Sequence, residues 1–160
     1  MNKITTKIKY NDLTFGLKME YRLYQFLKKE NPAVEWLSLT DKFSMFDYRL
    51  GDVYIELKAR RYIKKRFDKN GGHMIETSKF QFLKKNNIKK AIIFYMYQDG
   101  LYKFTYRTHS NKKTYTIADG GRADRKASTE LKKVAYIDGK YLKLVSQNIY
   151  TPVEKDICIL

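Results

Sequence analysis

Residues 46–58 read FDYRLGDVYIELK, and this stretch decides the fold. Its two arms, Lys42–Leu50 and Asp52–Lys58, meet at Gly51, which predicts a β-hairpin. Side chains alternate between the two faces of a strand. In the second arm one face is apolar (Val53, Ile55 and Leu57), and the other carries Asp52, Tyr54, Glu56 and Lys58.

The segment before this hairpin predicts a helix over Thr14–Asn31 and a strand over Val34–Thr40. Thr14 is a suitable N-cap, and Pro32 ends the helix. The apolar residues of the helix recur at helical spacing: Leu17, Tyr21, Tyr24 and Leu27.

The segment after the hairpin begins with a basic, flexible connection over Arg60–Gly72. A second helix is predicted over about Thr77–Asn86, capped by Thr77 or Ser78. The nearly continuous apolar run Lys90–Gln98 then predicts a strand covered on both faces in the middle of a sheet.

Shorter strands follow this central strand. Leu101–Arg107 is predicted to pair with it, and Val134–Ile137 is predicted to form a hairpin with Tyr141–Val145 around Asp138-Gly139. Thr108–Lys133 is polar and basic and receives no assignment. The element order predicts an α/β (α+β) fold, with a mixed β-sheet flanked by helices, in one domain over residues 1–160.

The charge of the chain indicates a polyanionic partner. Its 33 Lys and Arg residues against 17 Asp and Glu residues give a formal charge of +16. The hydrophobic content of 43% is high enough for a folded core, which excludes wholesale disorder.

The remaining composition excludes several classes of protein. The single cysteine, Cys158, excludes a disulfide framework, and Ala91–Tyr97, the longest apolar stretch, is far shorter than a membrane span. We therefore expect an intracellular protein with no membrane partner. No P-loop, dinucleotide fingerprint, zinc finger or nucleophile elbow is present. His73 and His109 receive no role, because each is predicted to stand alone in a loop.

Two carboxylates and an ammonium meet at the predicted hairpin. Period-two alternation puts Glu56 and Lys58 on one face, about 7 Å apart, and the hairpin returns Asp47 beside them. Neighbouring acids repel each other unless a cation lies between them, and oxygen ligands suit Mg²⁺ or Mn²⁺. The Leu57 carbonyl is a further potential ligand.

Such a site next to strong positive charge indicates phosphodiester hydrolysis. Lys58 either orients the attacking water and offsets charge, or accepts a proton. Glu20, on the apolar stripe of the first helix, is either a third acid or a helix-edge residue that reaches water. The alternative for the whole group is a solvated hairpin face with a surface ion pair worth well under ~1 kcal/mol.

Glu20, Phe46-Asp47 and Ile55-Glu56-Leu57-Lys58 together resemble the motifs of the PD-(D/E)XK nuclease superfamily, over about residues 14–98. Phe46 stands where that superfamily often has proline. The resemblance implies a restriction-endonuclease-like fold with a helix-strand-strand-strand-helix-strand core. It also implies an auxiliary polar residue on the second helix, for which Lys79 and Gln81 are the candidates.

The basic residues predict how a polyanion is contacted. Seven of the twelve residues in Lys58–Lys69 are basic, so this run is expected to follow a phosphate backbone. Its expected contacts are Arg60, Arg61, Lys64, Lys65 and Arg66. Thr108–Lys133 is either a loop that contacts nothing or a second clamp, with Lys112, Lys113, Arg122, Arg125 and Lys126.

The sequence thus predicts a Mg²⁺- or Mn²⁺-dependent endonuclease that acts on DNA, in which Asp47 and Glu56 hold the ion. Because a chain this short has little surface beyond its catalytic core, a homodimer that cuts two strands, as in junction resolvases and restriction-type enzymes, is a reasonable expectation. Two alternatives stay open: a nucleic-acid-binding protein without catalytic activity, and an RNA-directed nuclease of the same fold.

Overall fold

The computed structural model describes residues 3–120, 132–147 and 149, with side chains from residue 15 onward. The helices are α1 (Lys3–Glu30), α2 (Leu37–Thr40), α3 (Lys64–Lys69), α4 (Thr77–Lys85) and the short 3₁₀ helix η1 (Gly139–Tyr141). The strands are β1 (Glu35–Trp36), β2 (Tyr48–Leu50), β3 (Val53–Ala59), β4 (His73–Glu76), β5 (Lys90–Tyr97), β6 (Gly100–Arg107), β7 (Tyr115–Gly120), β8 (Lys132–Ile137) and β9 (Lys143–Ser146).

The predicted hairpin is confirmed and lies inside a six-stranded mixed sheet, in the order β1-β2-β3-β5-β6-β9. Strands β2 and β3 pair antiparallel with Tyr48 opposite Ile55, and Gly51 turns between them at a φ of 58°. That left-handed conformation suits glycine. Strands β3 and β5 are parallel, so α4 belongs to the crossover that connects them.

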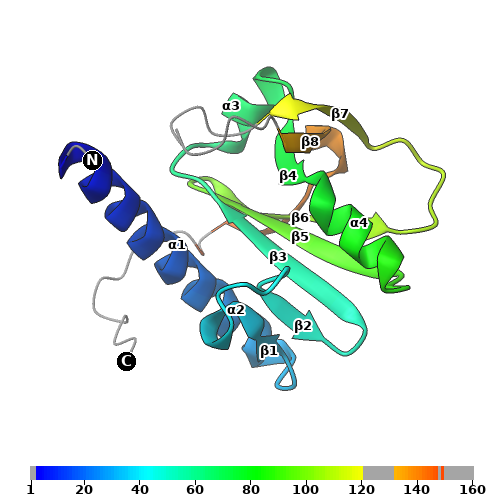
Figure 1. Ribbon diagram of the computed structural model, residues 1–160, viewed down its shortest axis with the longest axis horizontal. Helices are drawn as coiled ribbons and strands as arrows, with labels where there is room; N and C mark the ends of the chain where they lie inside the picture. The colour runs from blue at the N-terminus through cyan, green and yellow to red at the C-terminus, as the bar shows by residue number, and fades with distance from the viewer. Residues whose placement is uncertain (1–2, 121–131, 148, 150–160) are drawn as a thin grey trace.

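The two faces of this sheet are covered by different elements (Figure 1). Helix α1 packs on one face through Met19, Leu23 and Leu27, together with Ile55 and Leu57. The other face packs against α4 and against a three-stranded sheet in the order β4-β8-β7. Strand β5 is buried on both sides, as its apolar run predicted. The predicted mixed sheet flanked by helices is therefore confirmed.

The predicted hairpin of Val134–Ile137 with Tyr141–Val145 is wrong. Strand β8 pairs with β4 and β7 in the small sheet, whereas β9 pairs with β6 at the edge of the large sheet. Asp138 instead caps η1, since its Oδ1 accepts a hydrogen bond from the Lys140 amide at 3.0 Å. Short strands are directed to partners by tertiary packing, which an Asp-Gly turn signal does not encode.

Several predicted boundaries also differ from the structure. Helix α1 starts at Lys3, so Thr14 lies inside it and is not its cap. Within Val34–Thr40 only Glu35 and Trp36 are strand, and Leu37–Thr40 forms α2; within Lys42–Leu50 only the last three residues pair. The connection Arg60–Gly72 contains α3 and leads into β4. The N-cap of α4 is Glu76, not Thr77 or Ser78.

The buried stripe of α1 is rotated from the predicted one. Leu17 is 40% exposed, whereas Leu23 is fully buried against the sheet. Met19, Leu23 and Leu27 recur at the same spacing of four residues as Leu17 and Tyr21, so spacing alone does not choose between the two stripes. None of the described helices combines the length and the apolar character needed to cross a bilayer.

Candidate active site

The structure brings Asp47, Glu56 and Lys58 together at the β2–β3 hairpin. Asp47 directly precedes β2, and Glu56 and Lys58 lie on β3 with their side chains on the face that α4 covers. Continuing the β2–β3 register places Asp47 opposite Glu56. The Leu57 amide donates a hydrogen bond to Asp47 Oδ2 at 2.9 Å, which fixes the Asp47 carboxylate beside the end of the hairpin.

Glu56 is a buried carboxylate with one oxygen left without a hydrogen bond. Its side chain is 7% exposed. Oε1 lies 3.1 Å from Lys79 Nζ and 3.4 Å from Lys58 Nζ, whereas Oε2 is buried with no hydrogen-bond partner among the described residues. The alternative of a solvated hairpin face is therefore wrong for Glu56, because α4 and the small sheet cover this face.

Burial and repulsion from neighbouring carboxylates raise the pKa values of Glu56 and Asp47. The pKa of Glu56 rises to about 7 because of burial and the nearby Asp47 charge, against the opposing effect of Lys58 and Lys79. The pKa of Asp47 rises to about 6, again through burial first, and then through the charge of Glu20. Ionising both acids in this site is therefore costly without an additional cation.

Glu20 points into the site instead of reaching free solvent. Its Oε2 accepts hydrogen bonds from Trp36 Nε1 at 3.2 Å and Ser38 Oγ at 3.0 Å. Burial raises the pKa of Glu20, although these two hydrogen bonds oppose the shift. Tyr48 donates its hydroxyl to the Glu20 backbone carbonyl at 2.5 Å, which ties α1 to β2. Glu20 is thus a third acid beside Asp47.

Lys58 has a second carboxylate partner that the sequence did not single out. Its ammonium donates to both oxygens of Glu76, at 2.9 and 2.8 Å. Burial opposes ionisation of Glu76, but the charge of Lys58 outweighs it and lowers the Glu76 pKa. Glu76 immediately precedes α4. Its position at the start of the second predicted helix was the one feature of the sequence that could have pointed to it.

Helix α4 contributes Lys79 and not Gln81. The Lys79 ammonium donates to the Met45 carbonyl, pairs with Glu56 and lies 5.2 Å from the centre of the Phe46 ring. Gln81 is two residues further along the helix, about 200° around its axis, and is exposed. Of the two auxiliary candidates, the structure therefore brings only Lys79 to the carboxylates.

The basic run lies along the far end of β3 and on α3. The Arg61 guanidinium lies 4.3 Å from the centre of the Phe15 ring, and Arg66 stacks 3.8 Å above the Tyr62 ring. Lys64 pairs with Asp68 at 2.9 Å, Lys65 is exposed, and Arg60 donates to the Ala59 carbonyl at 2.8 Å. Arg122, Arg125 and Lys126 lie outside the described residues.

His73 was predicted to lie in a loop without a partner, and both expectations are wrong. It is fully buried on β4, with Nε2 at 2.7 Å from Asp68 Oδ1 and Nδ1 at 2.5 Å from the Tyr97 hydroxyl. Burial lowers its pKa, against the effect of Asp68. The chain Asp68–His73–Tyr97 therefore connects α3 to β4 and β5 and has a structural role.

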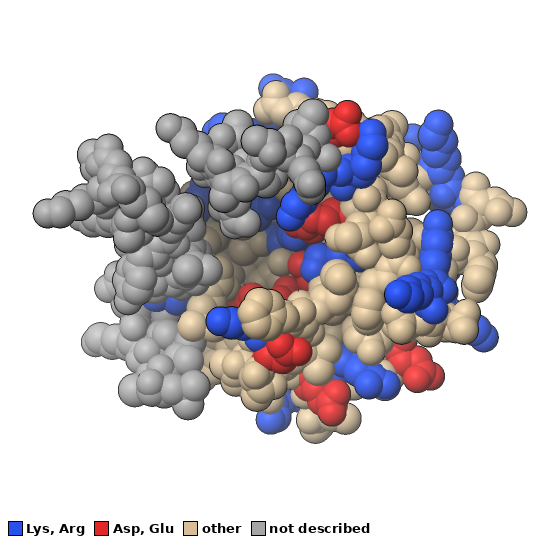
Figure 2. All heavy atoms as spheres, viewed as in Figure 1, with Lys and Arg blue, Asp and Glu red and all other residues tan. Residues whose placement is uncertain are grey.

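Acidic and basic side chains adjoin in a hollow over β3, between α1 and α4 (Figure 2). Within the described part of the chain, no cluster of three or more His, Cys, Asp or Glu side chains has a metal-binding arrangement. Lys58 and Lys79 offset part of the negative charge, since both pair with Glu56.

Comparisons with known proteins do not identify the chain. No family model, no curated protein and no solved structure matches it.

Proposed function

We propose that the protein is a metal-dependent endonuclease that hydrolyses phosphodiester bonds, with DNA as its substrate. The observation that carries this proposal is the buried Glu56 carboxylate, whose Oε2 has no hydrogen-bond partner among the described residues although Asp47 lies beside it. Burying a charged group without full compensation costs several kcal/mol. Features of this kind persist where a function requires them.

The donor set fits a hard divalent cation. Mg²⁺ is commonly held by one or two carboxylates together with water and substrate phosphate oxygens, so two acids suffice. Asp47 and Glu56 would hold Mg²⁺ or Mn²⁺, with the Leu57 carbonyl as a further ligand. When bound, such an ion polarises the phosphoryl group and lowers the pKa of a water molecule.

The lysines and the remaining acids have separate tasks in this proposal. Lys58 is held by Glu76 on one side and Glu56 on the other, a position from which its ammonium offsets negative charge that develops on the phosphoryl group. Lys79 is anchored by the Met45 carbonyl and steadies the segment that carries Asp47. Glu20 adds a negative charge beside Asp47, which strengthens the attraction of the site for a cation.

The order of the elements supports the resemblance to PD-(D/E)XK nucleases. The elements α1, β1, β2, β3, α4 and β5 follow the order that the resemblance implies, with Asp47 and Glu56 on adjacent strands. The additional elements α2, α3 and β4 interrupt that order. The exposed basic residues of Lys58–Lys69 start where β3 ends, so a phosphate backbone that follows them leads to the carboxylates.

The test is nicking of circular DNA by the purified protein with Mn²⁺, with Mg²⁺ and with a chelator. We expect nicking that depends on the metal and is lost in Glu56→Gln. Glu35→Gln is the matched control, because Glu35 is an exposed acid outside the site. Metal-dependent nicking that survives in Glu56→Gln would refute the proposed site.

The same assay addresses the alternatives. Binding of DNA without any cleavage would make the protein a nucleic-acid binder, and faster cleavage of RNA strands of the same sequence would make it an RNA-directed nuclease. Paired nicks on opposite strands, together with a dimer mass by light scattering, would support the proposed homodimer.

A further inference from the structure

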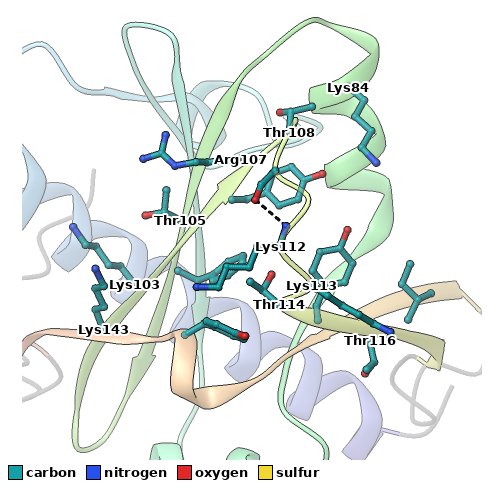
Figure 3. A pocket seen from close by; sticks show the side chains of 16 residues that line it. Lys84, Lys103, Thr105, Arg107, Thr108, Lys112, Lys113, Thr114, Thr116 and Lys143 are labelled. Carbon is teal, nitrogen blue, oxygen red and sulfur yellow. Dashed lines mark hydrogen bonds between the residues drawn. The ribbon is translucent and has the colours of Figure 1, made fainter.

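A cavity separate from the carboxylate site lies at the β6 edge of the large sheet. It has a volume of about 810 Å³ and is lined by β6, the segment that connects β6 to β7, the start of β7, and single residues from α4, η1 and β9 (Figure 3). Glu56, Ile93 and Phe104 are in register on β3, β5 and β6, so the Phe104 backbone at the cavity is about 10 Å from that of Glu56.

We propose that this cavity binds the phosphate backbone of one polynucleotide strand, without recognising its bases. The inference rests on the proposed function only for the choice of a polynucleotide. Its evidence is the charge of the cavity, the open edge of β6 and the packing of the aromatic rings.

The cavity concentrates positive charge that is not balanced by acids. Six of its lining residues are cations and none is an Asp or Glu, and none of the six forms an ion pair with another described residue. They are Lys84, Lys103, Arg107, Lys112, Lys113 and Lys143. A concave surface of one charge focuses its field and attracts a polyanion.

Two of these cations are placed in a way that costs stability. Lys103 and Lys143 are direct cross-strand partners on β6 and β9, and like charges in such pairs destabilise a sheet. Figure 3 shows the two side chains next to each other, with Lys112 extending toward the same side. A bound phosphate group between them would turn this repulsion into attraction.

The edge of β6 next to these lysines is open. Pairing with β9 ends at Lys103, so residues 104–107 have no strand partner on that side within the described part of the chain. Backbone amides on an open edge are free to donate hydrogen bonds. Thr105 and Thr114 also line the cavity, and hydroxyl donors of this kind are typical ligands of phosphate oxygens.

The aromatic rings of the cavity are already engaged and are not available to stack on bases. Tyr106 stacks on Phe80 with centroids 4.0 Å apart, and Tyr115 lies 5.1 Å from the same ring. The Tyr141 ring has Lys112 at 4.9 Å and Lys140 at 5.1 Å. Binding should therefore depend on phosphates and be indifferent to base sequence, in contrast to stacking platforms.

The size of the cavity favours one strand over a duplex. A volume of 810 Å³ corresponds to a cube of roughly 9 Å on a side, narrower than the roughly 12 Å major groove of DNA alone. Helix α4 carries Lys79 at the carboxylates and Lys84 at the cavity. A strand that passes along this helix would reach both sites.

The test is the salt dependence of oligonucleotide binding, measured by fluorescence anisotropy with a labelled oligothymidylate of about ten nucleotides. A chelator is present throughout, so no cleavage occurs. The variant is Lys112→Ala with Lys143→Ala, two exposed lysines on one side of the cavity. The control is Lys28→Ala with Lys29→Ala, two exposed lysines near the end of α1.

Each lost phosphate contact should reduce the slope of log K against log salt by about 0.7 for a single strand. The slope for the cavity variant should therefore be smaller by about 1.4 than that for the wild type. If the two proteins bind equally at about 1 M salt, the variant should bind roughly 25-fold more weakly than the wild type at about 0.1 M. The control pair should leave the slope unchanged. Thermal unfolding followed by circular dichroism confirms that both variants fold.

A second variant, Lys84→Ala with Lys113→Ala, tests the other side of the cavity and should lose a similar slope. Oligoadenylate should bind the wild type as tightly as oligothymidylate, and inorganic polyphosphate should displace both. Unchanged slopes in both cavity variants, or a strong preference for one base, would overturn the inference.

These results separate the two proposals. Metal-dependent nicking with unchanged slopes would support the proposed nuclease activity and refute strand binding in the cavity. Reduced slopes without nicking would support strand binding and refute the nuclease activity.

Discussion

The buried carboxylate of Glu56 should make the stability of the metal-free protein depend on pH in a way that Glu56→Gln abolishes. The pKa of Glu56 is about 7 in the folded protein, against 4.5 for an unperturbed glutamate. The folded state therefore holds this proton more tightly than the unfolded chain does. The contribution of Glu56 to the free energy of unfolding is fully present below about pH 4.5 and is lost as the pH rises through about 7.

The magnitude follows from the difference between the two pKa values. At 1.36 kcal/mol per pH unit, ionising Glu56 in the folded protein costs about 3 kcal/mol of stability between about pH 4 and about pH 8. The amide introduced by Glu56→Gln would keep the shape of the side chain and carry no titrating proton. The stability of the Glu56→Gln variant relative to wild type should therefore rise by about 3 kcal/mol over this range.

The assay is urea unfolding of wild type, Glu56→Gln and the exposed control Glu35→Gln, in a chelator, at a series of pH values. Comparing variants removes the contributions of the other acids, including Glu76 and Asp68, whose pKa values are lowered. Parallel curves for wild type and Glu56→Gln would refute the reasoning, because they would mean that Glu56 ionises as easily in the folded protein as in the unfolded chain.

Four further substitutions test three separate parts of the structure. Leu23→Ala should cost about 3 kcal/mol of unfolding free energy and Leu17→Ala under about 1 kcal/mol, because Leu23 is fully buried and Leu17 is 40% exposed. Urea unfolding measures both losses. Equal losses would contradict the orientation of α1. Gly72→Ala should lower the midpoint of thermal unfolding, because the φ of Gly72 is 116° and an added Cβ would lie 2.6 Å from the Ile137 carbonyl oxygen. An unchanged midpoint would contradict that close approach. Lys58→Met should reduce metal-dependent nicking by about 10²-fold or more, with oligonucleotide binding in chelator nearly unchanged; full nicking activity would remove Lys58 from the proposed mechanism.

The central hairpin was predictable because local signals and tertiary packing agree there. Period-two alternation and a glycine turn are short-range features, and the structure keeps both, with Tyr48 opposite Ile55. The same register placed Asp47 beside Glu56. The hairpin proposed around Asp138-Gly139 failed because its two arms join different sheets, a choice made by long-range packing that the turn signal does not contain.

The other half of the site depended on contacts that no sequence spacing encodes. Lys58 meets Glu76 across 18 residues, and Lys79 reaches the Met45 carbonyl across 34. Both contacts exist because α4 crosses the sheet above β3. The prediction that His73 stands alone was wrong because its partner Tyr97, on the central strand, is 24 residues away in the sequence.

Direct measurement of Mn²⁺ binding tests the central claim, that Asp47 and Glu56 are held together for a divalent cation. Titration calorimetry at about pH 8, where both acids are ionised, should detect one Mn²⁺ site in the wild type. The affinity should fall by about tenfold or more in Glu56→Gln and stay unchanged in Glu35→Gln, and it should weaken at about pH 5 as protons compete. No Mn²⁺ binding at about pH 8, or equal affinity in wild type and Glu56→Gln, would contradict the account.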